Sequence, residues 1–146
     1  MRHINLVVIH CSATQEGVDY DVATIRKWHK LRGFKDIGYH FLVHLDGRIE
    51  KGRPVEQIGA HAKGYNRDSI GVCYIGGLDH YRKPKDTRTV AQYHALRRIV
   101  ETLQIIYHAT EVVGHRDLSV DLNGDGVISK NEWMKQCPCF DVKTEL

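Results

Sequence analysis

Two histidines each end a short apolar run, and two cysteines lie close together near the C-terminus. His10 follows the run from residue 4 to residue 9, His115 follows residues 111–114, and the tail 135–139 reads KQCPC. Two imidazoles and one thiolate are a known ligand set for catalytic zinc, and they leave the fourth tetrahedral position for water. Because a chain with ten histidines and four cysteines contains many such triples, spacing alone does not define a site.

A second group of possible ligands lies within one segment. Residues 121–132, DLNGDGVISKNE, fit the twelve-residue calcium loop, with oxygen-bearing side chains at its first, third, fifth and ninth places, glycine at the sixth and glutamate at the twelfth. An acidic surface turn is the alternative. The preceding HRDLSV has no helical pattern, so a full helix-loop-helix hand is not expected. The predicted calcium ligands are Asp121, Asn123, Asp125, Val127, Ser129 and Glu132.

The element that must position His10 is the stretch 4–14, INLVVIHCSAT. Its apolar, β-branched residues predict a strand buried on both faces, and ligand sites in open α/β sheets lie just beyond the carboxyl ends of such strands. Considered alone, a histidine at this edge is more often a hydrogen-bonded core residue than a ligand.

The rest of the chain alternates helical and strand-like patterns. Residues 21–31 predict a helix with Val22, Ile25, Trp28 and Leu31 on one face, capped by Asp19 or Asp21. Asp46-Gly47 predicts a hairpin over 38–52. Residues 69–75 and 111–114 predict further strands, and 89–107 predict a long amphipathic helix. The order predicts one α/β domain over residues 1–146, with a central mixed sheet of about five strands flanked by helices.

Composition narrows the class of protein. A chain of 146 residues with a net charge of +3 indicates one domain, and this charge is too small and too evenly spread to indicate a nucleic-acid groove. No stretch is long enough for a membrane span, and residues 1–10 do not resemble a signal peptide, so synthesis in a bacterial cytoplasm is expected. Four scattered cysteines do not predict a disulfide framework; Cys73 is expected in the core, and His29, His94 and His108 on the surface.

Several segments together resemble the zinc-dependent N-acetylmuramoyl-L-alanine amidases of the phage-lysozyme type, relatives of the peptidoglycan recognition proteins. They are VVIHCSAT, IRKWHKLRGFKDIGYHF, DGRIEKGRP, HAKGYNRDSIGVCYIGG, the helix from Thr89, GHRD and KQCPCFD, and they span nearly the whole chain. Segment 121–132 is an insertion that departs from the family's basic pattern.

The resemblance implies roles for individual residues. The zinc ligands would be His10, His115 and Cys137, with Cys139 as the alternative to Cys137, and Tyr39 and Lys135 would assist catalysis. Without the family, Tyr39 would fit a core aromatic equally well. Lys135 alone would be interpreted as a solvated surface residue. Negative charge develops on the amide oxygen during attack, and a lysine or a tyrosine aimed at it would stabilise this charge. His61, Lys63 and Asn66 are expected to line the substrate groove, although His61 could instead satisfy a turn.

The resemblance implies an enzyme that uses Zn²⁺ to cut the bond between N-acetylmuramic acid and L-alanine. The loop pattern of the insertion separately predicts a Ca²⁺ site. We expect a phage or prophage endolysin: a monomer acting on cell-wall peptidoglycan after release, without a nucleic-acid or membrane partner. Two alternatives are a non-catalytic peptidoglycan-binding module and a cytoplasmic amidase that recycles muropeptides. By family resemblance, recycling amidases tend to have an aspartate as third ligand, which ranks that reading lower.

Overall fold

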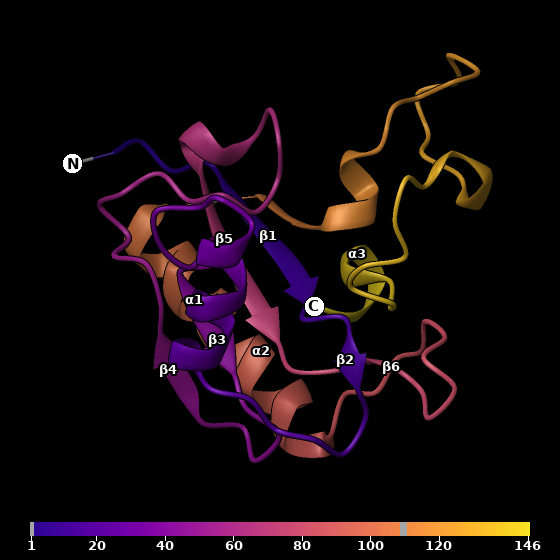
Figure 1. Cartoon of the computed structure of the whole chain (residues 1–146). Helices are drawn as coiled ribbons and strands as arrows, with labels where there is room; N and C mark the ends of the chain where they lie inside the picture. The colour runs from indigo at the N-terminus through magenta and orange to yellow at the C-terminus, as the bar shows by residue number, and fades with distance from the viewer. Residues whose placement is uncertain (1, 109–110) are drawn as a thin grey trace.

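A five-stranded mixed sheet forms the centre of the molecule (Figure 1). The computed structural model describes residues 2–108 and 111–146. The strand order is β4-β3-β5-β1-β7, and all neighbours are parallel except the β3–β4 hairpin. The expected α/β architecture is therefore confirmed. The strands are β1 (Leu6–Cys11), β3 (Phe41–Val43), β4 (Ile49–Lys51), β5 (Ser69–Tyr74) and β7 (Glu111–Gly114).

Helices cover the two faces of this sheet (Figure 1). Successive strand residues point to opposite faces, so Val72 and Cys73 of β5 belong to two different cores. Val72 packs in a cluster with α2 (Val90–Tyr107), whereas Cys73 packs in a cluster with α1 (Val22–Leu31). Cys73 is fully buried, as its apolar surroundings predicted. His10 lies opposite Cys73 in the β1–β5 pairing. Its side chain therefore points to the same face of the sheet as Cys73, which is the face that α1 covers.

Both long helices start where the sequence predicted and bury slightly different faces. Asp21 caps α1 by accepting from the backbone N–H of Thr24, and Thr89 caps α2 with a capping box. Leu31 is 79% exposed whereas Val22 and Ile25 are buried, so the prediction that it shares one face of α1 with them was wrong. His29 was expected on the surface and is buried, because its Nδ1 accepts the N–H of Gly38 at 2.8 Å.

The remaining segments extend the carboxyl edge of the sheet. Two short strands, β2 (Thr14–Gln15) and β6 (Gly77–Leu78), pair in parallel beyond β1 and β5. A 3-10 turn at His115–Leu118 precedes the 121–132 segment, a second 3-10 turn at Lys130–Glu132 ends it, and α3 (Val142–Glu145) follows. Among the described residues, no helix combines the length and the apolar character that crossing a bilayer requires.

Candidate metal centre and substrate cavity

Strand pairing brings the two strand-end histidines together. β1 pairs with β7 in parallel, with Ile9 opposite Gly114, so the next residue of each chain segment is a histidine at the same edge. The imidazole rings of His10 and His115 have centroids 4.7 Å apart. Both side chains are buried, at 2% and 7% exposure. Two residues 105 positions apart in the sequence thus meet because their strands are neighbours.

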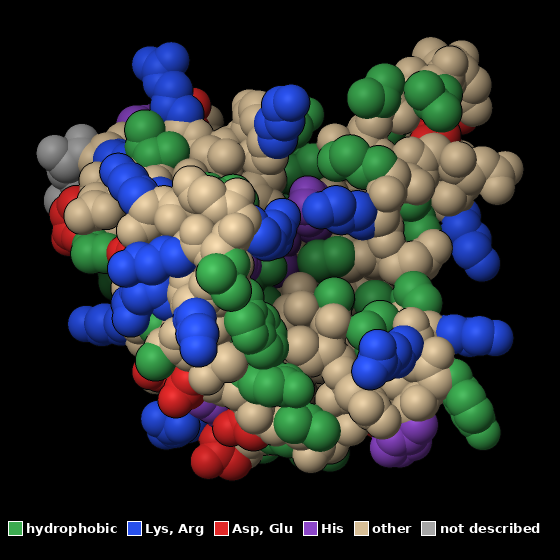
Figure 2. All heavy atoms as spheres, in the orientation of Figure 1, with side chains coloured by type: hydrophobic (Ala, Val, Ile, Leu, Met, Phe, Trp, Pro, Cys, Tyr) green, Lys and Arg blue, Asp and Glu red, His purple; other side chains and the backbone are tan. Residues whose placement is uncertain are grey.

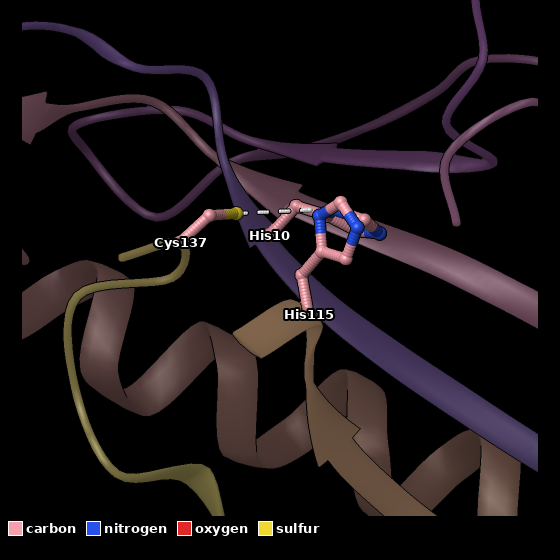
Figure 3. A group of neighbouring side chains, drawn as sticks. All are labelled: His10, His115 and Cys137. Carbon is pink, nitrogen blue, oxygen red and sulfur yellow. Dashed lines mark hydrogen bonds between the residues drawn. The ribbon is translucent and has the colours of Figure 1, made fainter. Parts of the chain in front are cut away.

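The tail brings a thiol to the same point. The backbone N–H of Arg116 donates to the carbonyl of Cys137 at 2.9 Å, which fixes the tail against the residue after His115. The Sγ of Cys137 lies 3.8 Å from the Nδ1 of His10 (Figure 3). One donor atom from each of His10, His115 and Cys137 lies within 4.8 Å of the other two.

These donors suit a zinc ion. Zinc–nitrogen distances of about 2.0–2.1 Å and zinc–sulfur distances of about 2.3 Å in a tetrahedron place nitrogen and sulfur about 3.6 Å apart, close to the 3.8 Å between His10 and Cys137. Burial lowers the pKa of His115 to about 4, and the nearby charge of Lys135 adds to this effect. Burial, followed by His61 and His115, also lowers the pKa of His10. Both imidazoles are therefore neutral at pH 7, the form that binds metal.

The three donors lie on the floor of a cavity of about 870 Å³. Figure 2 shows this hollow with histidine side chains in its depth and lysine and arginine side chains around it. One wall comes from α1, the opposite wall comes from the loop 60–66, and the tail closes a third side. The cavity is large enough for a substrate, and its rim is basic. The wall residues are Trp28, His29, Arg32, Ala60, His61, Ala62, Lys63, Gly64, Asn66, Met134 and Lys135.

Tyr39 and Lys135 both border the cavity. The ring of Tyr39 lies 5.2 Å from that of His10, between centroids. Burial, with a smaller contribution from neighbouring thiols such as Cys73, raises the pKa of Tyr39 well above its usual value, so it keeps its proton at neutral pH. Lys135 is exposed, and its charge acts on both His10 and His115. The structure therefore places a hydroxyl and an ammonium group around the candidate metal ligands.

The three residues expected to line the groove do so in different ways. Lys63 is exposed on the rim. Asn66 accepts the backbone N–H groups of His61 and Ala62 at 2.9 Å each, so its side-chain oxygen shapes the loop. His61 is 8% exposed, and both of its ring nitrogens face protein atoms.

Sequence reasoning missed the contribution of α1 to the cavity. Trp28, His29 and Arg32 lie on successive turns of this helix or just beyond it and line one wall. The sequence pattern groups Trp28 with Val22 and Ile25 on one face of the helix and predicts His29 on the surface. The period of the helix shows which residues share a face, but it does not show that a cavity adjoins that face. Trp28, His29 and Arg32 are spaced by one, three and four residues, and this spacing was the sequence signal that they lie on one side of the helix.

The segment 121–132 gathers its acidic side chains away from the cavity. One carboxylate oxygen from each of Asp121, Asp125 and Glu132 lies within 4.8 Å of the others. Asp121 accepts the backbone N–H groups of Gly124 and Gly126, at 3.0 and 2.8 Å. Glu132 accepts from the backbone and the hydroxyl of Ser129 and from the N–H of Leu122. Backbone hydrogen bonds, first that of Ser129, lower the pKa of Glu132 to about 2.

Comparisons with known proteins find relatives over nearly the whole chain. Residues 1–139 match the family model described as N-acetylmuramoyl-L-alanine amidase. The endolysin of Klebsiella phage KP32 is 39% identical over 137 residues, which are 94% of this chain and 82% of the relative.

Two solved structures have a similar fold. The amidase LysC from Clostridium intestinale URNW superimposes with a TM-score of 0.71 at 26% identity, covering 94% of this chain and 77% of that one. A complex of the peptidoglycan recognition proteins LCa and LCx with tracheal cytotoxin gives a TM-score of 0.68 at 31% identity, covering 94% and 76%.

Proposed function

The chain belongs to the N-acetylmuramoyl-L-alanine amidase family, and we propose that it is a zinc-dependent hydrolase of peptidoglycan. The bond cut is the amide between N-acetylmuramic acid and L-alanine. One observation carries the proposal: donor atoms of His10, His115 and Cys137 lie within 4.8 Å of one another on the floor of a cavity of about 870 Å³. The names of the relatives support peptidoglycan or a muropeptide as substrate.

His10, His115 and Cys137 are the residues that would hold the ion. Zinc in such a site supplies Lewis-acid activation of water and of an amide carbonyl. The two imidazoles are neutral and so offer lone pairs. The N–H of Cys11 donates to the Sγ of Cys137 at 3.2 Å and stabilises negative charge on that sulfur.

Tyr39 and Lys135 would act on the reacting amide. Negative charge develops on the carbonyl oxygen when the amide is attacked, and the Lys135 ammonium can stabilise it. The hydroxyl of Tyr39 retains its proton and can donate a hydrogen bond to the same oxygen. We also propose that this hydroxyl passes a proton from the attacking oxygen to the leaving amine; the position of the Tyr39 ring beside both the cavity and His10 supports this role.

The basic rim favours an anionic substrate. Arg32 on the α1 side and Lys63 on the loop side line the same cavity, and stem peptides carry carboxylates. We propose that Lys63 contacts the muropeptide directly, whereas Asn66 holds the loop that presents Lys63 through its bonds to the backbone at 61 and 62. A phage or prophage endolysin that acts on the wall after cytoplasmic synthesis is the biological setting we propose.

Digestion of intact peptidoglycan tests the function. The purified protein is incubated with sacculi, and new L-alanine amino termini and new reducing sugar ends are counted. An amidase produces the amino termini without reducing ends. Binding to sacculi without either product would favour a non-catalytic peptidoglycan-binding module, and cleavage of free muropeptides alone would favour a recycling amidase.

We also propose that residues 121–132 bind Ca²⁺. The full twelve-position pattern of the loop supports this proposal, together with the approach of the Asp121, Asp125 and Glu132 carboxylates to within 4.8 Å. Asn123, Ser129 and the carbonyl of Val127 would supply the other oxygens. Glu132, at the twelfth position of the loop, is 7% exposed and accepts the backbone N–H of Ser129. This hydrogen bond holds its carboxylate in place.

A further inference from the structure

We propose that His61 and Ser69 form a buried relay that fixes the tautomer and the ring orientation of the zinc ligand His10. This inference rests on the proposed zinc site. It gives His61 a positioning role in place of the direct substrate contact that its place in the loop suggested.

The relay is a continuous chain of side-chain contacts. The Nε2 of His10 lies 2.9 Å from the Nδ1 of His61, and the Nε2 of His61 lies 3.2 Å from the Oγ of Ser69. The two imidazoles meet edge to face, with centroids 5.0 Å apart and planes at 89°. The three residues are 2%, 8% and 0% exposed. Little of these side chains is therefore open to water that could compete for their hydrogen bonds.

The direction in which the hydrogen bonds of the relay are donated follows from which ring nitrogen of His10 faces the other zinc ligands. Its Nδ1 faces the Sγ of Cys137 at 3.8 Å, so Nδ1 must present a lone pair to a metal and Nε2 must carry the proton. The Nε2–H of His10 then donates to the Nδ1 of His61. His61 in turn carries its proton on Nε2 and donates it to the Oγ of Ser69. The opposite direction would put a proton on Nδ1 of His10, where it blocks metal binding.

The surroundings hold the His61 ring in one place. Asn66 fixes the backbone at His61 by accepting its N–H at 2.9 Å. The ring packs against Gly71 of β5, where an added Cβ would lie 2.6 Å from the imidazole. Ser69 begins the same strand, and β5 pairs directly with β1, which carries His10. The relay is therefore anchored on the two central strands.

Other buried histidines do not share this role. The rings of His40 and His61 meet edge to face with centroids 5.8 Å apart, but the nitrogens of His40 bind the N–H of Gly71 and the carbonyl of Gln57. His29 lines the same cavity and accepts the N–H of Gly38. His29 makes no hydrogen bond to His10, His115 or Cys137 among the described contacts, which makes it a matched control.

The test is the zinc affinity of the full chain, measured by competition with a chromophoric chelator. Loss of a hydrogen-bond partner of a metal-bound histidine typically weakens metal binding by about 10- to 100-fold. We expect a loss of this size for His61→Ala, a smaller loss for Ser69→Ala and the wild-type value for His29→Gln. His61→Asn, whose side-chain oxygen can stand where Nδ1 stands, should recover part of the affinity. Circular dichroism of the metal-free proteins identifies any variant that does not fold.

A spectroscopic measurement separates positioning from simple stabilisation. In the Co²⁺-substituted protein, the visible d–d bands should shift in His61→Ala and not in His29→Gln, because only the former releases the His10 ring. If wild type binds no zinc, the proposed function itself fails. If wild type binds zinc, and both His61→Ala and Ser69→Ala match its affinity and Co²⁺ spectrum, the zinc site stands and the relay is overturned.

Discussion

The backbone N–H of Cys11 donates to the Sγ of Cys137 at 3.2 Å, joining the end of β1 to a tail residue 126 positions away. Cys139, two residues further, instead donates its thiol to the carbonyl of Gly77 at 3.5 Å. A hydrogen bond with Cys11, followed by burial, raises the pKa of Cys139. Both cysteines thus contact Cys11, but among the described residues it is Cys137, and not Cys139, that lies in the group with His10 and His115.

The first prediction concerns these two thiols. Cys137→Ser should weaken zinc binding by more than about 100-fold, beyond the effect expected for a residue that only supports a ligand. Cys139→Ser, the matched control, should keep one zinc per chain. Elemental analysis after dialysis measures the zinc content of both variants. Zinc retained by Cys137→Ser and lost by Cys139→Ser would reverse the ligand assignment.

The second prediction separates chemistry from binding. Tyr39→Phe and Lys135→Ala should each lower kcat by about 10²- to 10³-fold, because both side chains are proposed to stabilise charge that exists only in the transition state. Zinc content and binding to sacculi should stay at wild-type levels. Kinetics on soluble muropeptide, with metal analysis of the same samples, provide the measurement. If either variant keeps a near-wild-type kcat, the side chain that it lacks has no catalytic role.

More of the fold than of the candidate site could be predicted from the sequence. Apolar runs located β1 and β5, and the Asp46-Gly47 turn located the β3–β4 hairpin, because these signals are local. The period of a strand does not reveal its neighbour, so the adjacency of His10 and His115 came from family resemblance and not from spacing. The contact between His10 and His61 joins residues 51 positions apart, and no local pattern encodes it. The burial of His29 depends likewise on Gly38, which lies outside its helix.

The third prediction concerns stability at low pH. Burial lowers the pKa of His29 and of His40 to about 4, with smaller effects from Arg32 and Arg53 on His29 and from Arg2 and Arg53 on His40. In the unfolded chain these groups take up protons near pH 6.5. Between pH 6.5 and pH 4 the unfolded state therefore binds more protons, and the free energy of unfolding falls as the pH falls.

Urea unfolding of the metal-free protein at several pH values measures this effect. Each imidazole contributes at most about 1.4 kcal/mol per pH unit to the slope. His29→Gln should reduce the slope, because a neutral amide can accept the Gly38 N–H without titrating. His94→Gln, at an exposed position of α2, should leave it unchanged. Equal slopes in wild type and His29→Gln would contradict the assigned cause.

The last prediction connects the proposed calcium loop to the zinc site. Trp133 follows Glu132 and stacks on the guanidinium of Arg116 at 3.8 Å, and Arg116 follows His115. The N–H of Met134 donates to the Oγ of Ser119 at 3.1 Å, and that hydroxyl donates to the carbonyl of Arg116 at 2.7 Å. Because these contacts join the end of the loop to the segment that carries Lys135 and Cys137, we expect order in the loop to order that segment as well.

Without Ca²⁺, the repulsion among Asp121, Asp125 and Glu132 should loosen this segment, and Ca²⁺ should tighten it with a Kd of about 10⁻⁴ to 10⁻³ M, typical of extracellular sites. Calcium is titrated into metal-depleted protein reconstituted with zinc, while amidase rate and protease resistance beyond His115 are followed. Both should rise together in wild type and stay flat in Asp121→Ala and Glu132→Gln. The contrary result is that the amidase rate and the protease resistance are already maximal before calcium is added and that both variants equal wild type. The loop would then order itself through its own hydrogen bonds, and calcium would have no part in activity.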